Sequence, residues 1–315
     1  MIPPRSEAHA TRNEQTRTTF TSLEQASFLP PTSATISAQA TRANVPHKVE
    51  DVPESNGAKI HWLGDSNAKS VLLYFHGGGY ALPPVEGHAL FLFETAKRFQ
   101  ATTQQPLLIA FLEYTLSTAG KFPLQLIQAT AALRLLLQKG FKPSNIVVGG
   151  DSAGGNMSLG LASQILHPYK GIPALKLDQP LAGVLLMSPF VSFDEDTKSF
   201  KENLQYDICG TGLLKEMVDS FVKPEQRNAW SEPLLAEPSH WKGFPAKKVL
   251  NLWGEAEMLR DAVSAQGEKL VKAGVNVRNV ECPSHVHVEC VLDASSGLGY
   301  GVMATEIWDW LASVF

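Results

Sequence analysis

The chain has 315 residues, of which 44% are hydrophobic, so it can bury one large α/β core or two modest ones. Its 27 lysines and arginines against 31 aspartates and glutamates give a formal net charge of −4, which argues against a protein that binds nucleic acid through its phosphates. The longest apolar runs, such as 107–112, fall far short of the roughly 20 residues of a membrane-spanning helix. We therefore expect a soluble protein with no membrane span.

The three cysteines, Cys209, Cys282 and Cys290, are too few and too scattered for a disulfide framework or a cysteine-based zinc site. The first residues contain no apolar stretch typical of a signal peptide, and Glu7 and Glu14 are unusual in a transit peptide. We expect a cytoplasmic protein whose polar N-terminus forms part of a lid or a frayed end.

Segments typical of strands and helices alternate along most of the chain. In chain order we predict strands at 47–52, 58–63 and 70–75, a helix at 86–99, a strand at 107–113, a helix at 123–138, a strand at 145–149, a helix at 153–166 and a strand at 182–187. After a mixed stretch that begins at Pro189, we predict a strand at 248–253, a helix at 261–273, a strand at 275–281 and a helix near 303–314. Strands rich in Val, Ile and Leu that alternate with helices predict a mostly parallel sheet with helices on both faces. An active site is then expected at the carboxyl ends of the strands.

The stretch "GDSAGGN" lies between a predicted strand and a predicted helix. It places Ser152 at the centre of a G-x-S-x-G pattern, which in this context forms a sharp turn that presents a serine nucleophile. The flanking glycines are needed because a side chain there would collide with the crossing strand and helix. Ser152 is therefore the predicted nucleophile.

A second glycine-rich stretch, "FHGGGY", follows the predicted strand at 70–75. A serine nucleophile creates an oxyanion on its substrate, and the backbone N–H groups of a loop without side chains can stabilise that charge. A phosphate-binding loop is the alternative, but the Gly-Lys-Ser/Thr of a Walker loop is missing, and no G-x-G-x-x-G with a ribose-binding acid follows. We predict an oxyanion loop and no cofactor.

The acid and base of a triad should follow the nucleophile in the order Asp or Glu, then His. After the strand at 248–253, the stretch "GEAEMLRD" offers Glu255, Glu257 and Asp261, although Asp261 also suits a helix N-cap. After the strand at 275–281, "CPSHVHVEC" offers His285 and His287. Because no third ligand lies near this His-x-His pair, we predict no metal site.

Taken together, "FHGGGY", "GDSAGGN", the acid in "EMLRD" and a late histidine resemble the hormone-sensitive-lipase-like family of α/β-hydrolases, and most closely its fungal members. The resemblance implies an eight-stranded α/β-hydrolase fold with a helical cap. By this resemblance Ser152 matches the nucleophile, Gly78, Gly79 and Ala153 match the oxyanion donors, and His76 and Gly77 open the oxyanion motif.

Two departures from the family pattern affect the acid and the base. The family commonly has Asp-Pro-Leu-Arg-Asp where this chain has Glu257-Met258-Leu259-Arg260-Asp261, which aligns Glu257 with the catalytic acid. The family histidine is often followed by Gly-Phe, which neither candidate has. We favour His287 over His285, because the base should lie beyond the end of the last strand and not at the start of its loop.

The predicted organisation is an N-terminal cap segment at 1–45 and a hydrolase domain at 46–315 with a cap insertion at about 190–245. The predicted function is a serine carboxylic-ester hydrolase, an esterase or deacetylase for small to medium apolar acyl groups, with a Ser152-His287-Glu257 triad. One alternative is a lactone-forming cyclase or an acyltransferase that tailors a fungal secondary metabolite, and another is a catalytically silent ligand receptor. The expected partner is a small-molecule ester, lactone or thioester, and a homodimer is possible.

Overall fold

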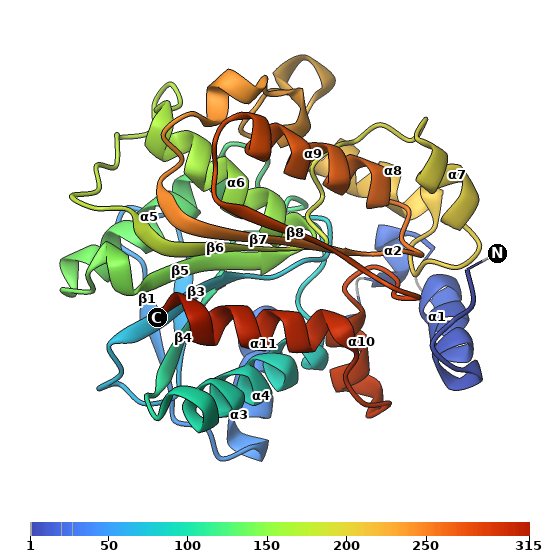
Figure 1. The fold of residues 1–315 in the computed structure, drawn as a ribbon, viewed down its shortest axis with the longest axis horizontal. Coiled ribbons are helices and arrows are strands. Elements are labelled where there is room, and N and C mark those ends of the chain that lie inside the picture. The colour runs from blue at the N-terminus through green and yellow to red at the C-terminus, as the bar shows by residue number, and fades with distance from the viewer. Residues whose placement is uncertain (1, 20, 27) are drawn as a thin grey trace.

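The computed structural model describes residues 2–19, 21–26 and 28–315, and its centre is a twisted eight-stranded sheet with the order β1-β2-β4-β3-β5-β6-β7-β8 (Figure 1). The strands are β1 (His47–Asp51), β2 (Lys59–Leu63), β3 (Ser70–Phe75), β4 (Leu107–Glu113), β5 (Ile146–Asp151), β6 (Leu181–Met187), β7 (Ala246–Gly254) and β8 (Val277–Cys282). The β1–β2 and β2–β4 pairs are antiparallel, and the pairs from β4 to β8 are parallel. The predicted fold class is confirmed.

Helices cover both faces of this sheet, because alternate residues of its buried strands point to opposite sides. In β3, Val71, Leu73 and Phe75 pack with α5 (Leu124–Gln138) and α6 (Ala153–Leu166). Leu72 and Tyr74 pack on the other side, in a core shared with α3 (Thr32–Arg42), α4 (Glu86–Thr103), α10 (Glu289–Ser296) and α11 (Val302–Val314). A further helix, α9 (Arg260–Lys272), covers β7 and β8 on the side of α6 (Figure 1).

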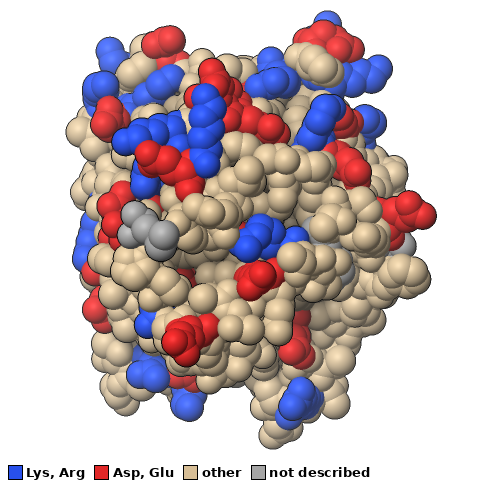
Figure 2. All heavy atoms as spheres, turned by 90° about the vertical axis from the view of Figure 1, so that its right-hand side faces the viewer, with Lys and Arg blue, Asp and Glu red and all other residues tan. Residues whose placement is uncertain are grey.

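Four short helices stand beyond the carboxyl ends of the parallel strands, on the right-hand side of Figure 1. They are α1 (Glu7–Thr19), α2 (Leu23–Ala26), α7 (Lys198–Asn203) and α8 (Thr211–Phe221). Figure 2 looks onto this side, where charged side chains are densest toward the upper edge and most of the middle is uncharged. Among the residues that the structure describes, no helix combines the length and the apolar character needed to cross a membrane.

The strand and helix positions agree with the sequence predictions to within a few residues, and the differences have local causes. Strand β8 begins at Val277 and not at 275, because the N–H of Val275 bonds to Leu270 O at the end of α9. The positions of α1, α2, α3, α7, α8 and α10 were not predicted. Most of these helices are short or polar, whereas α8 has an apolar face and lies in the stretch where the alternation lapses. Of the N-terminal segment, α3 packs against α4 and β1, whereas α2 lies against α8.

Candidate active site

Ser152 occupies a sharp turn between β5 and α6. Its backbone has φ 51° and ψ −116°, a conformation that a non-glycine residue rarely adopts. The turn is possible because α6 passes very close to β3: a Cβ on Gly154 would lie 1.8 Å from Phe75 O, and one on Gly150 would lie 2.2 Å from the same atom. The Gly-x-Ser-x-Gly spacing is therefore a direct requirement of this packing.

The three glycines after His76 form a loop at the end of β3. Gly78 and Gly79 have φ of +96° and +58°, a region that L side chains avoid. Among the described residues, the N–H groups of Gly78, Gly79 and Ala153 donate no hydrogen bond. Three backbone donors are thus left open beside Ser152, as an oxyanion site requires.

The buried side chain of His76 contacts this loop. Its ring is fully buried and its Nδ1 lies 2.7 Å from Gly77 O, while the Tyr114 hydroxyl donates to His76 O at 2.9 Å. Burial, together with the neighbouring His88, lowers the pKa of His76 to about 3. The ring is therefore neutral at physiological pH, and it contacts the carbonyl oxygen of Gly77 in the glycine loop.

Glu257 lies in the β7–α9 loop, and its side chain is fully buried. Its Oε2 accepts hydrogen bonds from the Ser188 hydroxyl at 2.6 Å and from Gly254 N–H at 3.1 Å. The same oxygen lies 3.7 Å from His287 Nδ1. This separation is longer than a hydrogen bond, but catalytic contacts of this kind often tighten only when substrate binds.

The two candidate histidines point to different places, although only one residue separates them. His287 lines a cavity together with Ser152, Gly78 and Gly79. The ring of His285 turns away: its Nδ1 lies 2.7 Å from Pro283 O, and its Nε2 is in contact with Gly301. The geometry therefore favours His287 as the partner of Ser152.

Three carboxylates act on the imidazole of His287. Burial is the largest single influence and lowers the pKa of this histidine, but Glu257, Asp207 and Asp151 together outweigh it, so the pKa lies above its usual 6.5. The site thus stabilises the protonated imidazole, the form that a general base takes after it accepts a proton.

The cavity around Ser152 has a volume of about 160 Å³ and is mostly apolar. The core of the fold contributes Ser152, Gly78, Gly79 and His287, and the short helices at this end contribute Thr16, Leu213, Leu214 and Met217. Polar groups in its wall include Asp151, Asp207 and His88. The alternative acids lie differently: Glu255 accepts Ser284 N–H at 2.9 Å, and Asp261 accepts Ser199 N–H at 2.8 Å.

Sequence reasoning missed three polar residues of this site. Asp151 lies inside the "GDSAGGN" motif, so its position beside the nucleophile was a usable signal. Nε2 of His88 lies 3.1 Å from Asp151 Oδ2. The only sequence signal for His88 was its position at the start of a predicted helix after the glycine loop. Asp207 lies in the stretch where the alternation of strands and helices lapses, and nothing in the local sequence marks it.

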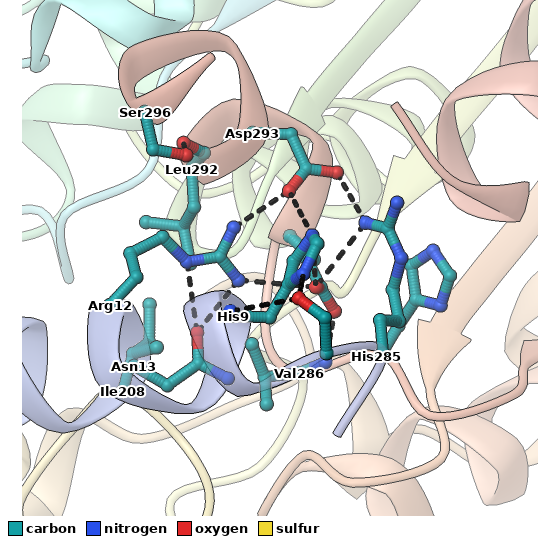
Figure 3. Close-up of polar contacts among 12 residues, drawn as sticks. His9, Arg12, Asn13, Ile208, His285, Val286, Leu292, Asp293 and Ser296 are labelled. Carbon is teal, nitrogen blue, oxygen red and sulfur yellow. Dashed lines mark hydrogen bonds and ion pairs between the residues drawn. The ribbon is translucent and has the colours of Figure 1, made fainter. Parts of the chain in front are cut away.

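A second polar cluster connects α1 to α10 close to this cavity (Figure 3). Arg12 contacts Asp293 at 2.6 Å and Glu289 at 3.1 Å, and Arg5 contacts the same two buried carboxylates at 2.5 and 3.3 Å. His9, Glu289 and Asp293 are close enough to share a metal ion, but the two guanidinium groups already pair with the carboxylates. The cluster is therefore an ion-pair network that ties α1 to the core.

The sequence pattern of the family described as "alpha/beta hydrolase fold" matches residues 72–291, from β3 into α10. The chain belongs to this family. The match confirms the predicted α/β-hydrolase family. The assignment of individual residues to the triad and the oxyanion hole stays a prediction.

Two curated relatives are each 29% identical to this chain over the aligned residues. One is a putative steryl acetyl hydrolase, mug81, of Schizosaccharomyces pombe, which is 29% identical over 82% of this chain and 69% of its own length. Another is carboxylesterase NlhH of Mycobacterium tuberculosis, 29% identical over 69% of this chain and 65% of its own. The matches thus span about two thirds of each relative.

Solved structures of esterases share the fold over nearly the whole chain. A thermostable esterase from Pseudomonas putida ECU1011 superposes with a TM-score of 0.74 at 24% identity, over 100% of this chain and 97% of its own. A fungal esterase from Rhizomucor miehei reaches a TM-score of 0.78 at 21% identity, over 99% and 96%. At such low identity, these similarities concern the fold.

Proposed function

We propose that the protein is a serine carboxylic-ester hydrolase that acts on short apolar acyl esters. The observation that carries this proposal is the shared cavity: Ser152, His287, Gly78 and Gly79 all line it, and Glu257 lies 3.7 Å behind His287. A nucleophile, a base and open backbone donors that meet in one apolar cavity are the elements of acyl transfer.

In the proposed mechanism His287 removes the hydroxyl proton of Ser152, and the Ser152 oxygen attacks the acyl carbon. The N–H groups of Gly78, Gly79 and Ala153 stabilise the resulting oxyanion. The C–O bond to the alcohol then breaks, and the alcohol leaves with the proton from His287. Water attacks the acyl-enzyme, gives its proton to His287 and releases the acid, after which Ser152 regains its proton. Throughout, Glu257 orients the imidazole and stabilises its charged form.

The size of the cavity supports a short acyl group. A volume of about 160 Å³ is well below the roughly 300–1,000 Å³ of pockets that hold drug-sized ligands. Two relatives carry names that point the same way: the steryl acetyl hydrolase named above and an acetyl-hydrolase of Streptomyces hygroscopicus, 26% identical over 69% of this chain and 67% of its own length. We therefore propose acetyl and similar short acyl esters as substrates.

We also propose that residues 1–45 and about 190–245 contribute the cap of a hydrolase domain at 46–315. The support is that Thr16 and Leu29 from the first segment and Leu213, Leu214 and Met217 from the second line the cavity. Because these segments form one side of the cavity, substrate selection should depend on them.

Replacement of Ser152 tests the proposed function. Ser152→Ala should abolish hydrolysis of p-nitrophenyl acetate and labelling by a fluorophosphonate probe. Ser158→Ala is the matched control, because Ser158 is a buried serine of α6, the helix that Ser152 precedes, and bonds only to Gly154 O among the described residues. Undiminished turnover by Ser152→Ala would refute the proposal.

A further pair of variants tests the base. His287→Ala should lose most of the rate and His285→Ala should not.

Hydrolysis and transfer of the acyl group to a hydroxyl use the same residues, so product analysis by mass spectrometry in the presence of candidate alcohols separates the esterase from a cyclase or acyltransferase. A silent receptor would form no acyl-enzyme at all.

A further inference from the structure

Asp207 is a buried carboxylate that the proposed mechanism does not use. Asp207 lies between α7 and α8, only 1% of its surface is exposed, and it lines the cavity that holds Ser152 and His287. Aspartates are almost never fully buried unless they are partnered. The partners of Asp207 therefore indicate its role.

The carboxylate of Asp207 accepts backbone N–H groups from both loops that carry the proposed acid and base. Its Oδ1 accepts the N–H of His287 at 3.0 Å and that of the adjacent Ile208 at 2.9 Å, and its Oδ2 accepts the N–H of Met258 at 2.7 Å. Met258 directly follows Glu257. One side chain thus bonds to the β7–α9 loop beside the proposed acid, Glu257, and to the β8–α10 loop at the proposed base, His287. The proposed mechanism requires a fixed distance between these two residues.

Asn203 strengthens the same connection. Its side-chain amide donates to Glu257 O at 3.0 Å, and its own carbonyl accepts the N–H of Asp207 at 2.9 Å. The segment 203–207 is therefore bonded to the acid loop at Glu257 and Met258 and to the base loop at His287. Neither loop can shift relative to the other without breaking at least one of these bonds.

The charge of Asp207 also acts on the imidazole, since Asp207, Asp151 and His287 line the same cavity. Glu257 from the β7–α9 loop, Asp207 from the segment between α7 and α8, and Asp151 from the end of β5 all raise the pKa of His287. On the α1 side, Arg17 donates to the backbone carbonyl of Asp207 at 2.8 Å and not to its carboxylate. Burial raises the pKa of Asp207, Glu257 raises it further, and His287 opposes both.

We propose that Asp207 is a positioning residue of the hydrolase: it fixes the spacing of Glu257 and His287 through backbone N–H groups and places a negative charge beside the imidazole when that ring carries a proton. This inference rests on the proposed function. It makes the chemistry depend on a side chain from the insertion between β6 and β7, so the active site is complete only when the segment between α7 and α8 is in place.

Three variants separate this role from a merely structural one. Asp207→Asn keeps the shape but removes the charge and one acceptor. Asp207→Glu keeps the charge but displaces the acceptors. The matched control is Glu232→Gln, because Glu232 is also a buried carboxylate outside the sheet, accepts Phe193 N–H at 2.9 Å and pairs with Arg227, and does not line the cavity.

Two measurements are made on each full-length variant. The first is kcat and KM for p-nitrophenyl acetate as a function of pH, at a temperature where circular dichroism shows the variant to be folded. The second is an NMR titration of the His287 ring, assigned by its absence in His287→Ala, which needs no turnover. This second measurement keeps the inference testable if the substrate proposal is wrong.

We expect Asp207→Asn to lower kcat about tenfold to a hundredfold with KM nearly unchanged, and to move the midpoint of the His287 titration down by about one pH unit. Asp207→Glu should lower kcat but keep that midpoint, and Glu232→Gln should change neither. Unchanged kcat and midpoint in Asp207→Asn would overturn the inference while leaving the esterase proposal intact. Wild-type protein without Ser152-dependent hydrolysis would instead overturn the proposed function, and the ring titration would still decide the role of the Asp207 charge.

Discussion

The carboxylate of Asp151 accepts the N–H of Gly77 at 2.9 Å, so the residue before Ser152 holds the first glycine of the His76–Gly79 loop. The same Oδ1 accepts the Tyr74 hydroxyl at 2.7 Å, and Oδ2 lies 3.1 Å from His88 Nε2. Two loops from neighbouring strands are thus locked together by one fully buried group. Burial by itself raises the pKa of Asp151, but His88 and Tyr74 outweigh it and hold the pKa below 3.8.

Tyr74→Phe should therefore destabilise the protein. The buried carboxylate loses one of its hydrogen-bond donors, which costs about 1–3 kcal/mol of unfolding free energy. Because the folded-state pKa of Asp151 is lowered, its stabilising contribution is present above its unfolded pKa and is lost as the pH falls through the folded value. Urea unfolding at pH 7 and at acid pH measures both effects. Tyr300→Phe is the control, since the Tyr300 hydroxyl makes no hydrogen bond among the described residues, and an equal loss there would contradict the explanation.

The pH dependence of hydrolysis should report His287. Only the neutral imidazole can accept the Ser152 proton, and the pKa of His287 is raised above 6.5. The acid limb of kcat/KM should therefore have its midpoint above pH 6.5, with activity lost as the pH falls through it. A midpoint at or below 6.5 would show that the surrounding carboxylates do not stabilise the charged ring.

Glu257→Gln tests the acid. Glu257 has the largest pKa-raising influence on His287, so its neutral replacement should move the acid limb to lower pH. It should also lower kcat by about 10³-fold to 10⁴-fold, as the loss of a triad acid does in other serine hydrolases. Glu255→Gln, on the same loop, should remain within a few-fold of wild type. The reverse order of the two variants would transfer the role of acid to Glu255.

The sheet and the sharp turn at Ser152 could be predicted because their signals are local. Strand β3 is a short apolar run, and Gly150, Ser152 and Gly154 lie in one pattern whose glycines are required by the close approach of α6 to Phe75. Such features depend on residues within a few positions of each other, and a single sequence contains them in full.

Other features of the site could not be predicted because they depend on contacts between distant segments. His285 and His287 differ in direction only because the chain turns at Pro283 and Ser284 and enters α10 through a left-handed Val288. Asp207 is 51 residues from Met258 and 80 from His287, and its bonds to backbone N–H groups require no particular partner side chain. No pattern in the sequence therefore marks Asp207.

The ion pairs between α1 and α10 should contribute to stability, since Asp293 and Glu289 are buried beneath Arg5 and Arg12 (Figure 3). Arg12→Ala leaves both carboxylates with Arg5 as the remaining guanidinium partner. Removal of one partner from a buried ion pair costs about 3–5 kcal/mol, and we expect the loss here to be at the lower end because Arg5 stays. Lys272→Ala, which breaks an exposed pair with Glu268, should leave the thermal midpoint unchanged. Equal midpoints for both variants would contradict a structural role for this network.

The length of acyl chain that the enzyme accepts should depend on Met217 of α8. A Cβ on Gly79 would lie 2.2 Å from Met217 Sδ, so this thioether rests directly on the oxyanion loop and forms one wall of the cavity. Met217→Ala removes that wall and makes room for a longer chain. A methylene in an apolar pocket changes discrimination by about 10-fold to 200-fold, and we expect the ratio of kcat/KM for p-nitrophenyl hexanoate to that for the acetate to rise by about tenfold or more. Lys215→Ala, on the solvent side of the same helix, should leave the ratio unchanged. A ratio that stays constant in Met217→Ala would show that another wall limits the acyl chain.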